Sequence, residues 1–150
     1  MKIPEPIFKL INFIMGLLLR SPMHGLLSDS ILLIKYRGRT SGKNLVTPAR
    51  YIRLGDLIES FTSTSGQWWR NVKEQSAVTL IVAGVSGEYR ATVIIDQADK
   101  IEEALVRCLA LYPEDAAYHD IKRTPAGDLD ASDFERAIPS VVLIQWQQVM

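Results

Sequence analysis

Six consecutive residues, Gly38-Arg39-Thr40-Ser41-Gly42-Lys43, combine the residue types that bind an oxyanion. The two glycines allow the backbone to turn so that peptide N–H groups converge on one anion. Thr40 and Ser41 add hydroxyl donors, and Arg39 and Lys43 add positive charge. The stretch therefore predicts a phosphate-binding loop, and an ordinary polar hairpin turn is the alternative.

Basic residues are concentrated around this loop, although the 17 Lys and Arg balance the 17 Asp and Glu of the whole chain. Residues 1–75 carry a net charge of +6 and residues 76–150 carry −6. Between Ser30 and Gly55 there is no acidic residue, and the basic ones are Lys35, Arg37, Arg39, Lys43, Arg50 and Arg53. This distribution indicates an anion site or a solvated basic face, while the zero net charge argues against a nucleic-acid partner.

Arg50 occupies an unusual position in a predicted strand. Alternation places it on the same face as Val46, Pro48 and Ile52, which are all apolar. A ligand or a carboxylate from elsewhere in the chain would explain a charge at this position. Pro48 has no N–H to donate to a β-ladder, so this part of the strand is predicted to be an edge or a bulge.

Two adjacent tryptophans, Trp68 and Trp69, precede Arg70 and Asn71. We expect that adjacent indoles on a short helix cannot both face one core, so one of them should cover a ligand or the open mouth of a barrel. The alternative is that both pack as core residues from different sides.

The sequence lacks the residue patterns of serine hydrolases and of zinc sites. There is no G-x-S-x-G elbow for a nucleophilic serine and no Cys/His spacing for zinc, so no metal site is expected. Cys108 lies on the apolar face of a predicted helix, and His24 and His119 are interpreted as surface or capping residues. The acidic residues 128–135 are interpreted as a solvated polar stretch.

The hydrophobic period predicts an α+β protein of one domain, residues 1–150, built around a small six-stranded barrel. The helices are expected at Pro6–Arg20, Gly66–Gln75, with Ser65 as its cap, and Asp99–Leu111, which Pro113 ends. A turn is expected at residues 84–87 and a polar connection up to Arg136. The strands are expected at Ile31–Arg37, Leu45–Leu54, Leu57–Ser63, Ala77–Ala83, Glu88–Asp96 and Ser140–Trp146.

The apolar run Ile7–Leu19 is too short to span a bilayer, which takes about 20 residues. Its amphipathic pattern predicts an in-plane membrane anchor or a lid on the barrel, within an N-terminal helical segment over residues 1–28. No signal-peptide cleavage pattern follows, so a cytoplasmic location with peripheral membrane contact is expected.

Three motifs together resemble the deazaflavin-dependent nitroreductase family. They are Tyr36-Arg37-Gly38-Arg39-Thr40-Ser41-Gly42-Lys43, then Thr47-Pro48, then Trp68-Trp69-Arg70-Asn71-Val72. The resemblance runs from about Leu17 through the tryptophan motif and more weakly to the end. It implies a split β-barrel of about six mostly antiparallel strands, similar to that of FMN-binding oxidases, and coenzyme F420 as the cofactor.

The resemblance also implies a set of site residues. The loop that cradles the cofactor's phosphate and acidic tail would be Arg39, Thr40, Ser41, Gly42 and Lys43. The strand beside the deazaflavin ring would contribute Pro48, Ala49 and Arg50, and the segments that close the ring site would contribute Ser63, Thr64, Ser65, Trp68, Trp69 and Asn71. On the acceptor side, hydrogen bonds or a proton would come from Tyr118, Tyr112 or Ser63.

The implied function is hydride transfer from reduced F420 to a quinone, a nitroaromatic compound or a conjugated carbonyl compound, by a monomer or homodimer. This sequence departs from the family in its shorter loop between Ser63 and Trp68 and in residues 70–77. Two alternatives stay open: an FMN-binding oxidoreductase, and a non-catalytic carrier of a flavin-like or lipid ligand on the same barrel.

Overall fold

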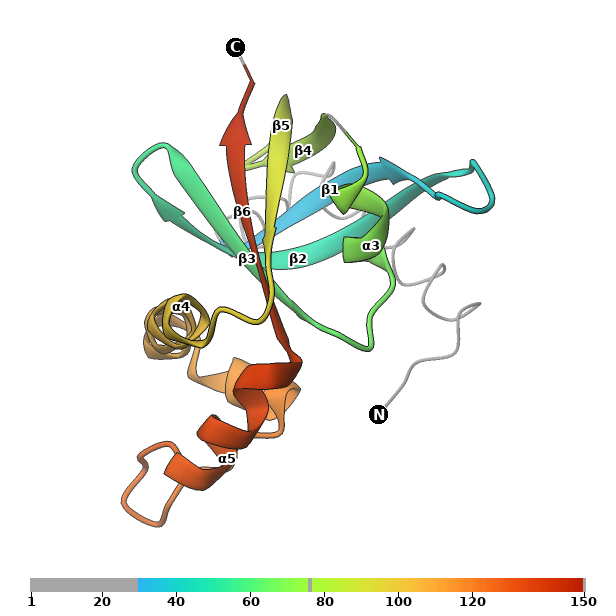
Figure 1. Cartoon of the computed structure of the whole chain (residues 1–150). Helices are drawn as coiled ribbons and strands as arrows, with labels where there is room; N and C mark the ends of the chain where they lie inside the picture. Colours follow the sequence, from blue (N-terminus) through green and yellow to red (C-terminus); the bar gives the residue numbers. More distant parts are fainter. Residues whose placement is uncertain (1–29, 76, 150) are drawn as a thin grey trace.

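The computed structural model describes residues 30–75 and 77–149 (Figure 1). Within them, six strands form a closed barrel in the order β1-β2-β3-β6-β5-β4, and every neighbouring pair is antiparallel. The predicted class and the six-stranded barrel are therefore confirmed. The predicted helix over Pro6–Arg20, with its anchor or lid role, lies outside the described residues.

The strands follow the predicted order along the chain. They are β1 (Ile31–Arg37), β2 (Asn44–Leu54), β3 (Leu57–Ser63), β4 (Val78–Val82), β5 (Val85–Ile94) and β6 (Val141–Gln148). Successive side chains point to opposite faces of a strand, so alternate residues fill the interior of the barrel. The buried residues of this inner core include Ile34, Tyr51, Ile58, Leu80, Ile144 and Trp146.

Helices cover one side of the barrel and one of its ends (Figure 1). They are α3 (Trp68–Lys73), α4 (Ala98–Leu111), the 3₁₀ helix η1 (Pro113–His119), α5 (Ala131–Ala137) and the 3₁₀ helix η2 (Ile138–Ser140). The apolar stripe of α4 and parts of η1, α5 and η2 form a second core against outward-facing residues of β5 and β6. No helix in the described part of the chain is both long and apolar enough to cross a membrane.

The turn between β4 and β5 is shorter than predicted. Ala83 and Gly84 both have positive φ, at 51° and 79°, as in a two-residue type I′ hairpin turn. Strand β5 consequently begins at Val85 and includes Gly87, which the prediction had assigned to the turn. A Cβ at Gly87 would lie 3.0 Å from Nε2 of Gln148, so close packing explains this glycine.

The polar connection predicted up to Arg136 is also wrong in part, because it contains helix α5. Asp130 caps this helix by accepting a hydrogen bond of 2.9 Å from the Asp133 N–H. The side chain of Asp133 accepts a second bond, of 3.0 Å, from the Lys122 N–H. Two acidic residues of this stretch, Asp130 and Asp133, therefore accept hydrogen bonds from backbone N–H groups instead of being only solvated.

Pro48 lies where β2 has a strand partner on one side only. Strand β2 pairs with β1 from Asn44 to Arg50 but with β3 only from Tyr51 onward. The Tyr51 N–H donates to the Ser30 carbonyl, so every second residue of β2, counted back from Tyr51, hydrogen-bonds to β1. Pro48 falls between two of these residues, where the β1–β2 ladder needs no N–H. The predicted edge position of Pro48 is thus confirmed locally, inside a barrel that closes elsewhere.

Candidate functional site

The loop Gly38–Lys43 joins β1 to β2 and uses several of its own N–H groups internally. The Gly38 N–H donates to the Lys43 carbonyl and the Gly42 N–H to the Gly38 carbonyl, each at 2.8 Å. The Lys43 N–H donates to Oγ of Ser41 at 3.2 Å. Gly42 has a φ of 68°, which a glycine adopts without strain. The loop is therefore a tight hairpin turn, and its side chains are its main means of holding an anion.

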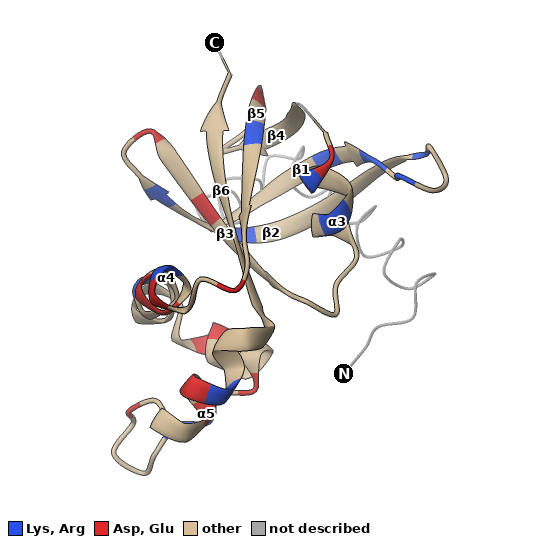
Figure 2. Cartoon of the chain, viewed as in Figure 1, with Lys and Arg blue, Asp and Glu red and all other residues tan. Residues whose placement is uncertain are grey.

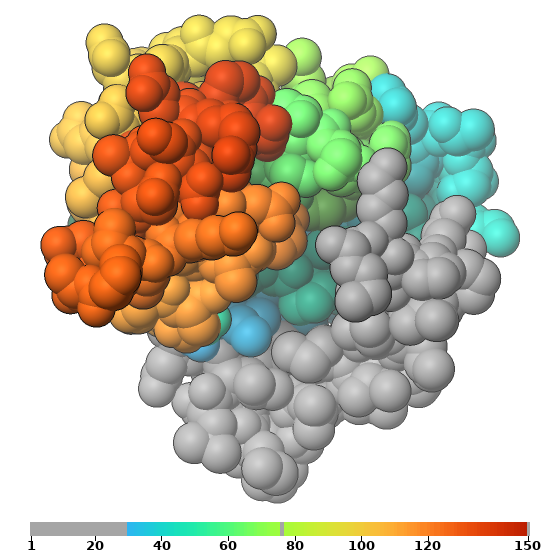
Figure 3. All heavy atoms as spheres, turned by 90° about the horizontal axis from the view of Figure 1, so that it is seen from below, coloured from blue at the N-terminus to red at the C-terminus, as the bar shows by residue number. Residues whose placement is uncertain are grey.

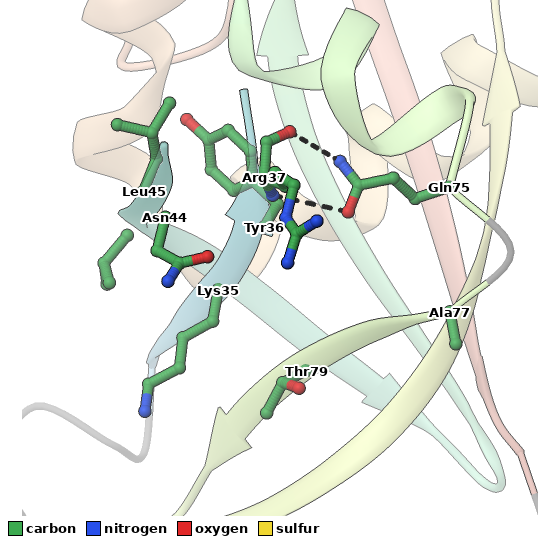
Figure 4. A pocket seen from close by; sticks show the side chains of 9 residues that line it. Lys35, Tyr36, Arg37, Asn44, Leu45, Gln75, Ala77 and Thr79 are labelled. Atoms are coloured by element: carbon green, nitrogen blue, oxygen red, sulfur yellow. Dashed lines mark hydrogen bonds between the residues drawn. The ribbon is translucent and has the colours of Figure 1, made fainter. Parts of the chain in front are cut away.

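Two neutral amide side chains hold this hairpin, Asn71 from α3 and Gln75 from just after its C-cap. Oδ1 of Asn71 accepts the Arg39 N–H at 2.8 Å. The Gln75 amide accepts the Arg37 N–H at 3.3 Å and donates to the Arg37 carbonyl at 2.8 Å, as the dashed lines of Figure 4 show. Since β4 begins only at Val78, Gln75 supplies the hydrogen bonds that a longer strand would give to the end of β1. Sequence reasoning missed Gln75.

Cations gather around the hairpin and α3 (Figure 2). In the described residues, no ion pair involves Lys35, Arg37, Arg39 or Lys43. An open groove of about 440 Å³ lies next to the loop (Figure 4) and is lined by Lys35, Tyr36, Arg37, Asn44, Leu45, Val46, Gln75, Ala77 and Thr79. These four cations thus stay available to an anion at one side of the molecule.

Trp68 and Trp69 are both buried in the inner core, so the expectation that adjacent tryptophans cannot share one core is wrong. They differ in their polar atoms. Within the described part of the chain the buried Nε1 of Trp69 has no hydrogen-bond acceptor, whereas Nε1 of Trp146, deep in the same core, donates to Ser60. The guanidinium of Arg70 lies 4.4 Å from the Trp69 ring centroid. Trp69 therefore carries an unused donor at one end of the barrel.

The loop between β3 and α3 lies beside that donor. An ideal Cβ at Gly66 would lie 3.9 Å from Cδ1 of Trp69 and 3.1 Å from Oγ1 of Thr62. Within the loop, the hydroxyls of Ser63 and Ser65 are 2.7 Å apart, and the Thr64 carbonyl accepts a bond from Arg70. Ser65 was predicted to cap α3, but it does not. The N-cap is Gln67, which makes no side-chain capping bond.

Arg50 meets the carboxylates that the sequence analysis allowed for. Its Nε and Nη2 donate to the two carboxylate oxygens of Asp115, each at 3.0 Å, and Nη2 also donates to Glu114 at 3.1 Å. The guanidinium lies 4.3 Å from the ring centroid of Tyr112. The hydrogen bond to Asp115 raises the pKa of Arg50, and burial raises the pKa of Tyr112.

Tyr118 stands at the end of the barrel on the η1 side. Its side chain is 62% exposed, while its hydroxyl lies 3.4 Å from Oγ1 of the buried Thr62. His119 packs edge-on against Tyr118, with ring centroids 4.9 Å apart, and also against Phe61. Burial lowers the pKa of His119. A phenol that is partly exposed and reaches the barrel wall is well placed to contact a small molecule.

Cys108 is buried on α4, as predicted, and burial raises its pKa to about 12. Close by, Glu59 is a charged residue that sequence reasoning missed. It is 1% exposed and accepts hydrogen bonds from Arg107 and Gln145, each at 3.0 Å. The period-two pattern of β3 could have shown that Glu59 lies on the outer face, beneath a helix.

Apart from Pro48, Ala49 and Arg50, which lie in β2, the predicted site residues fall into three groups along one side of the molecule. The hairpin and the helical region of residues 98–140 lie at opposite sides in Figure 3, and the green residues of the β3–α3 loop and α3 lie between them. The hairpin holds the cations, the middle region holds Trp69 and the serine-rich loop, and η1 holds Tyr118. This order suits a long ligand with an anionic end and a planar end.

Comparison with protein-family models finds no match, and comparison with curated proteins finds no relative. Solved structures do resemble this one. A pyridoxamine 5'-phosphate oxidase-related, FMN-binding protein from Nostoc punctiforme PCC 73102 is 16% identical, with 91% of this chain and 78% of that chain covered and a TM-score of 0.50.

An F420-H2 dependent reductase (FDR-A) is 18% identical, with 77% of this chain and 93% of that chain covered and a TM-score of 0.50. A Clostridium acetobutylicum protein of the pyridoxinephosphate oxidase family, related to general stress protein 26 of B. subtilis, is 13% identical, with 83% and 79% covered and a TM-score of 0.51. At such identities the likeness concerns the fold. The chain has the fold of the FMN-binding split barrels, as the sequence resemblance implies.

Proposed function

We propose that this protein is a deazaflavin-dependent oxidoreductase that transfers hydride from reduced coenzyme F420 to a quinone, a nitroaromatic compound or a conjugated carbonyl compound. The observation that carries the proposal is a set of cations with no acidic partner among residues 30–75 and 77–149, on a hairpin that Asn71 of α3 anchors, next to the buried tryptophan donor. The fold supports it, because solved structures with this fold include F420-dependent and FMN-binding proteins.

The residues present fit the two ends of this cofactor. Arg39 and Lys43, with the hydroxyl of Thr40, would hold the phosphate through charge-assisted hydrogen bonds. The adjacent groove, with Lys35 and Arg37 on its wall, would accept the carboxylates of the acidic tail. FMN has no such tail, so the surplus of cations favours the longer anion.

The middle of the site fits a planar ring with carbonyl groups. Nε1 of Trp69 is a buried donor without an acceptor, and leaving such a donor unpaired costs about 1–3 kcal/mol. A ring carbonyl beside the β3–α3 loop would remove that cost. The hydroxyl groups of Ser63 and Ser65 already bond each other and can turn to a ligand without breaking secondary structure.

When bound, a reduced deazaflavin supplies two electrons as hydride, and the acceptor also takes up a proton. The chain's own task is to orient the acceptor and to stabilise the charge that develops on it. Tyr118 is proposed to donate a hydrogen bond or the proton to the acceptor's oxygen, with Tyr112 or Ser63 as further donors. The Tyr118 hydroxyl lies 3.4 Å from Oγ1 of Thr62, at the barrel end.

Fluorescence titration tests this proposal. In a Trp146→Phe variant the only remaining indoles are Trp68 and Trp69, because the chain has three tryptophans. Titration with F420 should quench them at lower concentration than titration with FMN, and a mixture with reduced F420 and a quinone should show turnover. Tighter binding of FMN, or turnover with FMN alone, would contradict the cofactor assignment.

An FMN-binding oxidoreductase is the second candidate, since the fold is shared with FMN-binding proteins. The phosphate of FMN would use the same Arg39 and Lys43. Under this alternative Lys35 and Arg37 have no role in binding, so substituting them with Gln would leave FMN affinity unchanged. Binding of either cofactor without any turnover would instead support the non-catalytic carrier.

A further inference from the structure

Helix η1 is a short 3₁₀ segment whose backbone hydrogen bonds are local. The Asp115 N–H donates to the Tyr112 carbonyl, the Asp120 N–H to Ala117, and the Ile121 N–H to Ala116. Two hydroxyl contacts connect η1 and its N-cap to the barrel, and both are long at 3.4 Å: Tyr118 to Thr62, and Tyr112 to the Tyr51 carbonyl. Apolar packing also holds η1, through Ala116 in the second core and through His119 against Phe61. The shorter polar contacts from the barrel to η1 come from β2.

Arg50 of β2 makes those shorter contacts. Its planar guanidinium donates twice to Asp115 and once to Glu114, over 3.0 to 3.1 Å, and packs on the ring of Tyr112. A bidentate pair between a guanidinium and a carboxylate fixes direction as well as distance. Both side chains are partly buried, with 26% and 21% of their surfaces exposed, so solvent screens this pair less than a fully exposed pair.

The spacing of three residues carries this constraint to Tyr118. In a 3₁₀ helix, residues i and i+3 are eclipsed on one face. Tyr112, Asp115 and Tyr118 are spaced in this way. Tyr112 and Asp115 both contact Arg50, and Tyr118 contacts Thr62. When Asp115 is held in a fixed direction, the side chain one turn later is directed at the barrel end.

We propose that Arg50 is a positioning residue that holds η1 across the barrel end through Asp115 and thereby places the Tyr118 hydroxyl next to Thr62. This inference rests on the proposed function for the role of Tyr118. It gives Arg50 a different task from the one the sequence resemblance implies, because its Nε and Nη2 donors already bind η1. Arg50 then affects the acceptor step, whereas Arg39 and Lys43 affect cofactor affinity.

Amide hydrogen exchange tests the positioning without any cofactor. In Arg50→Gln, exchange in residues 114–119 should become about tenfold faster, as expected for losing a charge-assisted pair, while β3 and α4 should not change. Arg136→Gln is the matched control, because it removes the Asp133 ion pair of α5 and leaves η1 untouched. Unchanged exchange in η1 of Arg50→Gln would overturn the proposal.

Kinetics then separates positioning from a purely structural role. Arg50→Lys keeps the charge but loses the planar pair of donors that binds Asp115. It should lower kcat about tenfold and change the affinity for F420 less than twofold. Exchanging the charges, with Arg50→Asp and Asp115→Arg together, should restore a substantial part of kcat. A loss of F420 affinity with kcat unchanged would instead make Arg50 a cofactor ligand.

The two proposals fail in different ways. If the parent protein does not bind F420, the proposed function fails, while the exchange experiment still decides whether Arg50 holds η1. If Arg50→Gln does not fold, Asp115→Asn removes the same pair from the η1 side and replaces it in the exchange experiment. Fast exchange in η1 of Asp115→Asn supports the proposal, and unchanged exchange overturns it.

Discussion

The hairpin side of the molecule and its η1 side use positive charge in opposite ways (Figure 3). On the hairpin side, neutral amides from Asn71 and Gln75 make the structural hydrogen bonds, and the nearby cations have no acidic partner in the described residues. On the η1 side and on the adjoining helices, arginines pair with carboxylates: Arg50 with Asp115 and Arg107 with Glu59. Cations that stabilise the fold are thus distinguished from cations left for a ligand.

This difference shows why charge counted along the sequence is a weak guide to function. Arg50 and Arg39 lie in the same basic window, yet only Arg39 keeps its guanidinium free of ion pairs in the described residues. The partner of Arg50 lies 65 residues further along the chain.

Substituting both Arg39 and Lys43 with Gln should weaken F420 binding by roughly 1.5–3 kcal/mol for each charge-assisted hydrogen bond lost. Binding by the variant should also depend less on salt, because fewer charges contact the anion. Fluorescence titration at several salt concentrations measures both effects. Arg53→Gln, in the same basic window, is the control, and equal affinity of the double variant and the parent would refute the anion site.

On the opposite side of the comparison, Arg107→Leu should lower the free energy of unfolding by about 3 kcal/mol, because it leaves the buried Glu59 carboxylate without its cation. Arg136→Leu removes a pair one turn apart in α5 whose arginine is exposed, and Asp133 keeps its bond from the Lys122 N–H, so this variant should have little effect. Chemical denaturation of both variants checks this. Equal stability of the two would show that the Arg107 pair is not structural.

Tyr118→Phe removes only a hydroxyl and should slow turnover by an amount worth roughly 1–3 kcal/mol if that hydroxyl bonds a buried acceptor. Cofactor affinity should stay the same, because the anion site lies at the other end of the molecule. Steady-state rates with several quinones measure this effect. An unchanged rate with all of them removes Tyr118 from the mechanism.

Gln75→Ala should destabilise the protein by about 1 kcal/mol, since it leaves the N–H and carbonyl of Arg37 to water. It should also loosen the hairpin and weaken F420 binding slightly. Gln145→Ala is a comparison variant, because it removes an amide bound to a side chain far from the loop. Hydrogen exchange of residues 37–44 should increase in the first variant and stay unchanged in the second.

His119 gives the smallest predicted effect, a pH dependence. Burial lowers its pKa in the folded state, so the unfolded chain binds the proton more readily. The part of the free energy of unfolding that depends on neutral His119 is fully present above the pKa of the unfolded chain, near 6.5. It is lost as the pH falls through the lower pKa of the folded protein. His119→Gln should remove this part of the dependence. Denaturation curves between pH 5 and 8 that are parallel for parent and variant would contradict it.

The strands could be read from the sequence because local rules govern them. The alternation in β2 separated Thr47 and Tyr51, which face the interior, from Arg50, which faces outward, and Pro48 marked the place without a second strand partner. Helix α4 followed from its apolar stripe and from Pro113. In contrast, α5 was missed because its acidic residues are also typical of a solvated loop.

The chain itself therefore determined the order of elements, the inner face of each strand and the position of the basic loop, since side-chain period and turn residues act over a few neighbours. Tertiary structure alone decided which cations stay free. It brought Asp115 to Arg50, buried both tryptophans in one core and left Nε1 of Trp69 without an acceptor. Ion pairs and burial depend on groups distant in sequence, and only folding brings these within hydrogen-bond distance.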